Sequence, residues 1–162
     1  MKALTLDEIR LEDCVGHIQG KHIDEKIEGL VKAINYFGIR TIWSCQGSFE
    51  KYHFPFPWVQ VWLYPNIDSY QAALSELLNQ NPKYDFLRKR RDSKLNYLRK
   101  SLGLVQTIRE YNSNNGIMWK FECDDAIYLQ PEFPAKNEEE LDRLQDDAQK
   151  VADFIFLKAN HE

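Results

Sequence analysis

A regular alternation of side chains from Trp58 to Tyr64 constrains the fold of this chain more than any other feature. The apolar face of this stretch has Val59, Val61 and Leu63, and the more polar face has Trp58, Gln60, Trp62 and Tyr64. A period of two is typical of a strand with one buried and one more polar face. We therefore expect a sheet that helices cover on one face only.

Helical spacing of apolar residues predicts four helices, at 23–37, from Asn66 or Asp68 to Gln80, at 84–102 with Gly103 as its end, and after a capping box at Asn137 and Glu140. Besides 58–64, strands are predicted at 39–44, 104–111, 117–123 and 126–130. Most links between strands are too short for parallel crossovers. The predicted fold is an α+β two-layer sandwich, with a mainly antiparallel sheet of about five strands and helices on one face.

The chain has 162 residues, of which 43% are hydrophobic, and this predicts a single domain over 1–162. No apolar run approaches the roughly 20 residues of a membrane-spanning helix, and the first residues lack the apolar core of a signal peptide. Three widely spaced cysteines argue against a disulfide scaffold. We expect a cytoplasmic protein without membrane contact.

The strand predicted at 39–44 ends in the turn Ser44-Cys45-Gln46-Gly47, before a long loop that reaches Pro57. Gly47 can adopt positive φ, so the N–H groups of the turn could converge on an anion, and Ser44 and Gln46 add polar side chains. Cys45 could act as a nucleophile with His53 as its base, or could pack as a small apolar residue. These two residues are candidates only, and we assign no catalytic residue.

The turn and its surroundings predict a binding site for an anionic, nucleotide-like small molecule, which the protein would sense or sequester. The loop after the turn would form a lid over this site. Residues expected to bind the ligand by charge, hydrogen bonds or stacking are Arg40, Ser44, Cys45, Gln46, Gly47, His53, Trp58 and Trp62. Two alternatives are that the aromatic rings pack under a helix and that the turn merely ends a buried strand.

The stretch from Ile23 to Asn35, followed by Thr41 to Gly47, resembles the opening of the wybutosine-synthesis methyltransferase family of tRNA modification. It is also similar to small proteins of phage and bacterial genomes. The resemblance covers about a quarter of the chain, and Gln46 stands where the methyltransferase family has serine. It implies a strand-turn element near a polar ligand site. A nucleotide- or RNA-modifying enzyme that uses S-adenosylmethionine is the alternative function that the resemblance implies.

Charge is unevenly distributed, because residues 83–100 have a net charge of +6 and residues 122–147 a net charge of −8. The basic residues of the predicted third helix are Arg88, Lys89, Arg90, Arg91, Arg99 and Lys100. This face could bind nucleic acid, including RNA, or another protein, or let two copies meet head to tail as a homo-oligomer. The simplest alternative is a pair of solvated helix faces.

Cysteine and histidine residues near the N-terminus are candidate metal ligands. Cys14, His17 and His22 could bind one metal only if Cys45 or His53 completed the site. Asp124-Asp125 could bind a cation or act as a base, but a tight turn between strands explains this pair more simply. We therefore expect no metal.

Overall fold

The computed structural model describes residues 4–14, 22–63, 75 and 85–161. Its elements are the 3-10 turns η1 (Leu6–Glu8) and η2 (Leu11–Asp13), the helices α1 (Glu25–Phe37), α3 (Asp85–Asn114) and α4 (Glu138–Asn160), and the strands β1 (Arg40–Cys45), β2 (Trp58–Trp62), β3 (Trp119–Cys123) and β4 (Ile127–Pro131). The helix predicted to end at Gln80 lies outside the described residues apart from Ser75, which is helical.

The described strands form one antiparallel sheet in the order β1-β2-β4-β3. Val59 and Phe121 lie on either side of Leu129, so apolar side chains align across the sheet on one face. The register of β1 shifts between Thr41 and Ser44. The α+β class and the antiparallel sheet are confirmed, whereas the predicted number of about five strands is wrong because the described sheet has four.

The strand predicted at 104–111 is wrong because α3 continues through Gly103 to Asn114. Leu104, Ile108 and Tyr111 recur at helical spacing, and all three are buried. Gly103 does not end the helix. A Cβ at this position would lie 3.3 Å from Cζ of Phe37, so the glycine lets the Phe37 ring pack closely. Burial of a helical stripe outweighs the strand propensity of the β-branched residues in this segment.

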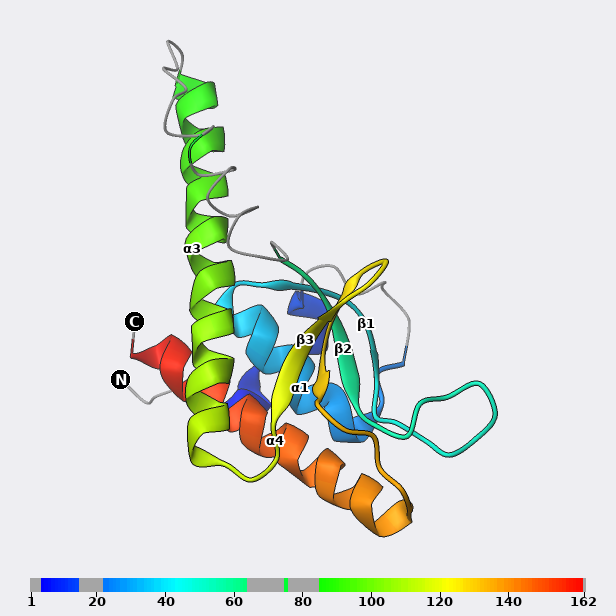
Figure 1. Cartoon of the computed structure of the whole chain (residues 1–162). Coiled ribbons are helices and arrows are strands. Elements are labelled where there is room, and N and C mark those ends of the chain that lie inside the picture. The colour runs from blue at the N-terminus through cyan, green and yellow to red at the C-terminus, as the bar shows by residue number, and fades with distance from the viewer. Residues whose placement is uncertain (1–3, 15–21, 64–74, 76–84, 162) are drawn as a thin grey trace.

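Helices α1 and α4 form the most extensive contact between two elements, and α1 also contacts β1 and β2 (Figure 1). Ile27 and Ile34 of α1 and Val151 and Ile155 of α4 are fully buried. They belong to one hydrophobic cluster with Val59 of the sheet. The helices therefore bury the apolar face of the sheet, as the alternation in β2 predicts. The two-layer arrangement of the fold as a whole stays a prediction.

Helix α3 is the longest element, and its N-terminal turns extend away from the sheet and from α1 and α4 (Figure 1). Its C-terminal half packs on α4 and on the start of β3. None of the helices in the described part of the chain combines the length and the apolar character that crossing a membrane requires.

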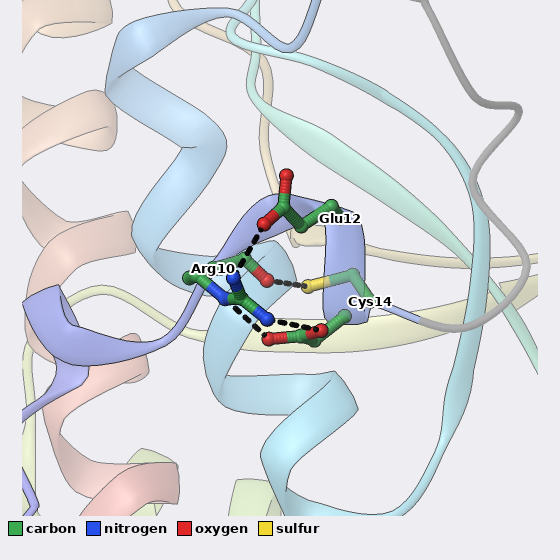
Figure 2. Close-up of polar contacts among 4 residues, drawn as sticks. Arg10, Glu12 and Cys14 are labelled. Atoms are coloured by element: carbon green, nitrogen blue, oxygen red, sulfur yellow. Dashed lines mark hydrogen bonds and ion pairs between the residues drawn. The ribbon is translucent and has the colours of Figure 1, made fainter.

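The N-terminal segment is held by short-range polar contacts (Figure 2). The Arg10 guanidinium pairs with Glu12 at 2.8 Å and with Asp13 at 3.0 Å. The buried Cys14 thiol donates to the Arg10 carbonyl oxygen at 3.8 Å, and burial raises the pKa of this thiol. His17 lies outside the described residues, and within those residues no three His, Cys, Asp or Glu side chains are arranged to hold a metal.

Candidate ligand-binding pocket

The Ser44–Gly47 turn lies where β1 ends, between the start of α1 and the first turns of α4. Gly47 has φ +89°, and a Cβ at this position would lie 2.7 Å from the main-chain carbonyl of Phe56 and 3.0 Å from Cδ1 of Leu141. The turn therefore needs a glycine both for its backbone conformation and for its close packing.

Gln46 connects the turn to α1 and to α4 by hydrogen bonds. Its N–H donates to Asp24 Oδ2 at 3.1 Å, and its side-chain Oε1 accepts from the N–H of Lys26 at 3.3 Å. The Gln46 carbonyl accepts from Gln145 Nε2 at 3.0 Å. The N–H of Gly47 is directed to Cys45 Sγ at 3.4 Å. The polar groups expected to bind an anion thus bond within the protein, and the Asp24 carboxylate already lies beside them.

Cys45 and His53 are not joined by a hydrogen bond. Burial is the main reason that the pKa of the Cys45 thiol is raised, and the nearby Asp24 carboxylate raises it further. His53 lies on the exposed loop, where its Nδ1 is 3.8 Å from a carboxylate oxygen of Glu50. A thiol that is kept protonated and has no bond to the His53 imidazole does not favour nucleophilic catalysis at this position.

The two tryptophans of β2 project from the more polar face of the sheet, away from α1 and α4. Trp58 packs edge-on against Tyr128 of β4, with ring centroids 5.6 Å apart. Trp62 is 55% exposed and packs against Tyr97 of α3, which also receives the N–H of Arg40 at 3.1 Å. Aromatic rings therefore line this face over much of its length.

A cavity of about 340 Å³ opens on the same face. It is lined by Phe54, Phe56, Trp58, Glu122, Asp124, Asp125, Tyr128 and Gln130. These residues come from the long loop, from β2, β3 and β4, and from the turn between β3 and β4. We call this cavity the sheet-face pocket.

Three carboxylates line the sheet-face pocket, and no basic residue is among its described lining residues. Lys120 pairs with Glu122 at 2.7 Å from the same strand. Asp125 accepts a long hydrogen bond from the Tyr128 hydroxyl at 3.4 Å, and no described residue bonds to the Asp124 carboxylate. Partial burial and the Asp125 and Asp124 carboxylates raise the pKa of Tyr128, so its phenol stays neutral. The pocket can therefore accept hydrogen bonds and positive charge.

A second cavity of about 290 Å³ lies between the β3–β4 hairpin and the first turns of α4, and it includes Phe133. Its charged groups already have partners. Arg143 pairs with Glu139 at 2.7 Å, and Glu140 accepts from the N–H of Lys136 at 2.7 Å. This cavity has fewer polar groups available to a ligand than the sheet-face pocket.

Of the predicted ligand-binding residues, only Trp58 lines the sheet-face pocket. Arg40, Ser44, Cys45, Gln46, Gly47, His53 and Trp62 are not among its lining residues. The prediction did not include Tyr128 and Gln130, although both alternate with buried residues along β4. Nothing in the sequence shows that β4 pairs with β2, and this pairing is what places Tyr128 against Trp58.

The predicted basic residues all belong to α3. Lys89 and Arg99 are exposed, whereas the Lys100 ammonium lies 5.6 Å from the centre of the Phe37 ring. For Arg88, Arg90 and Arg91 only the helical backbone is described.

The chain was compared with protein-family models, with curated proteins and with solved structures, and none of these comparisons found a match. The resemblance to the methyltransferase family therefore stays a prediction. We base the functional proposal on the geometry of the sheet-face pocket.

Proposed function

We propose that this protein binds a nucleotide-like small molecule in the sheet-face pocket, by its planar ring, and that it senses or sequesters this ligand. One observation supports the proposal above the others, namely that a single cavity combines aromatic walls with several hydrogen-bond acceptors. Ligand sites are typically clefts of about 300–1,000 Å³ with aromatic linings and a few polar groups.

The aromatic walls suit a flat ligand. Phe54 and Phe56 stack on each other with centroids 5.3 Å apart and planes 23° apart, whereas Trp58 and Tyr128 meet at 86°. A ring that entered the pocket would meet aromatic groups from the loop and from the sheet. Stacking of a base on an aromatic side chain contributes about 1–3 kcal/mol.

The polar groups favour the ring of a nucleotide over its phosphate. Carboxylates such as Asp124 and Asp125 accept hydrogen bonds from the amino groups of bases. They also repel a phosphate, so the anionic part of a nucleotide would have to extend out of the pocket. Gln130 can both donate and accept, and no described residue bonds to its side chain.

Calorimetric titration with a panel of nucleobases, nucleosides and nucleotides tests this proposal. Replacing Trp58 by Ala should weaken binding about tenfold or more through lost stacking. Trp62→Ala is the matched control, because it removes an exposed ring from the same strand outside the pocket, and it should leave affinity unchanged. Binding that is insensitive to Trp58→Ala, or no binding across the panel, would refute the proposal.

The same titration should include S-adenosylmethionine, which the methyltransferase alternative requires. This compound has an adenine ring and a positively charged sulfonium. Binding that is lost in Trp58→Ala, together with transfer of a labelled methyl group to RNA, would support methyl transfer. Binding without transfer would support sequestration.

Nucleic-acid binding by α3 is a second candidate function. The observation that favours it is the projecting N-terminal end of this helix, where Lys89 and Lys94 are exposed and lie close to a run of arginines in the sequence. Oligonucleotide affinity should fall steeply as salt rises, and should fall further in Lys89→Glu/Lys94→Glu. Lys150→Glu, an exposed change on α4, is the control. Absent or salt-independent binding would exclude this function.

A further inference from the structure

The charges around the sheet-face pocket say more about its ligand than its shape does. Glu122, Asp124 and Asp125 line the cavity, and Lys120 compensates for only one of them. Two carboxylates thus remain without a cationic partner among the described residues. Although all three acidic residues are exposed, an uncompensated negative charge on the wall of a cavity favours a ligand with positive charge.

The position of these carboxylates relative to the rings strengthens this argument. Tyr128 is opposite Glu122 in the sheet and is hydrogen-bonded to Asp125, so acidic groups lie beside an aromatic ring that also contacts Trp58. Aromatic faces attract cations, most strongly the face of tryptophan. The rings and the carboxylates of this pocket therefore favour the same kind of ligand.

We infer that the sheet-face pocket selects organic cations with a planar ring, such as an N-alkylated or protonated heteroaromatic base, over neutral rings of the same shape. This inference rests on the proposed function and assigns the class of ligand to that same pocket. Asp125 and Asp124 provide the charge, Trp58 and Tyr128 the aromatic surfaces, and the Phe54–Phe56 pair the wall on the side of the loop.

Asp125 and Asp124 should attract a ligand cation more strongly than Glu122, because Glu122 already has a cationic partner. The Lys120 ammonium lies 2.7 Å from Glu122, so a ligand would have to compete with an existing ion pair. Among the described residues, Asp125 has only the 3.4 Å contact with the neutral Tyr128 hydroxyl. A ligand cation can therefore approach Asp125 without breaking an ion pair.

Two probes that differ in charge but hardly in shape test the inference, namely N-methylquinolinium and quinoline, which is neutral near pH 7 or above. Binding of each to the full chain can be followed by calorimetry and by quenching of tryptophan fluorescence. Attraction between the ring cation and the uncompensated carboxylates predicts that N-methylquinolinium binds about tenfold more tightly than quinoline. Higher salt should reduce this preference.

Isosteric variants then assign the preference to particular carboxylates. Asp124→Asn/Asp125→Asn should bring the two affinities close together, and Trp58→Ala should weaken both. Asp146→Asn is the control, because it removes an exposed carboxylate of α4 that has no bonded partner among the described residues. Thermal melting verifies that each variant is folded.

The outcomes separate this inference from the proposed function. Equal affinity for both probes would overturn the cation preference and leave the ring-binding pocket in place. No binding of either probe would overturn both. A preference that persists in Asp124→Asn/Asp125→Asn would show that these carboxylates are not its source.

Discussion

The indole Nε1–H of Trp119 donates a hydrogen bond of 2.7 Å to the buried carboxylate of Asp147. The hydroxyl of Tyr111 donates to the other oxygen of the same carboxylate at 2.8 Å. One side chain of α4 thereby joins the end of α3 to the first residue of β3. No described cation pairs with this buried carboxylate, and the two donors satisfy it instead.

Replacing Asp147 by Ala should lower the free energy of unfolding by about 2–4 kcal/mol, because the Trp119 and Tyr111 donors would remain buried without an acceptor. Asp147→Asn keeps one acceptor oxygen and should cost less. Urea denaturation measures both, with the exposed Asp146→Ala as the control. Equal stability of Asp147→Ala and the wild type would show that the carboxylate is not needed to join these elements.

Stability should decline at alkaline pH. Burial, and then the hydrogen bond to Asp147, raise the pKa of Tyr111, and burial raises the pKa of the Cys45 thiol. A group whose pKa is higher in the folded state stabilises that state below its unfolded pKa, and this contribution is lost as the pH rises above it. These unfolded values are about 8.5 for cysteine and about 10 for tyrosine.

In Tyr111→Phe, the free energy of unfolding should therefore fall less steeply above about pH 10 than in the wild type. At neutral pH the variant should be less stable by about 1 kcal/mol, since it lacks the hydrogen bond. Denaturation at a series of pH values tests both statements. Parallel pH profiles for the two proteins would contradict the assignment to Tyr111.

Gly47→Ala should destabilise the protein by about 1–3 kcal/mol or more, because φ is +89° and the new Cβ would collide with the Phe56 carbonyl. Gly116→Ala is the matched control, because no atom lies within 4 Å of a Cβ at that position. A neutral effect of Gly47→Ala in thermal melting would mean that the turn can relax.

Gln46→Ala distinguishes a structural turn from a binding turn. The variant loses the side-chain hydrogen bond to the Lys26 N–H and should be less stable by about 0.5–1.5 kcal/mol. Its affinity for ligands of the sheet-face pocket should equal that of the wild type. Lost affinity in a folded variant would return the ligand site to the turn.

Much of the fold follows from local patterns. Helix α1 and strands β1 and β2 lie close to their predicted bounds. The Asn137 side chain accepts from the N–H of Glu140 at 2.8 Å, as the capping box predicts, although the Glu140 carboxylate accepts from the Lys136 N–H. These features depend on neighbours within a few residues, and so the sequence predicts them.

The candidate site was less predictable. The alternation in β2 marks Trp58 as a residue of one strand face, whereas the sequence of Asp124-Asp125 favours a tight turn over a cation site or a base. Asp125 meets Tyr128 and Trp58 through the pairing of β2 with β4, which are far apart in the sequence. The alternation in one strand sets which of its faces is buried, but it does not specify which distant strand pairs with it.

By itself, the sequence determined the class of fold, the covered face of the sheet and the need for a special backbone at Gly47, because periodicity and backbone sterics are local properties. Only the tertiary structure decided that 104–111 is helical, since Leu104 and Ile108 find a buried surface only when α3 continues past Gly103. It also decided that Gln46 bonds to two helices, and that rings and carboxylates from separate strands line one pocket. These outcomes depend on contacts between distant segments, whose free energies outweigh local propensities of a few tenths to about 1 kcal/mol per residue.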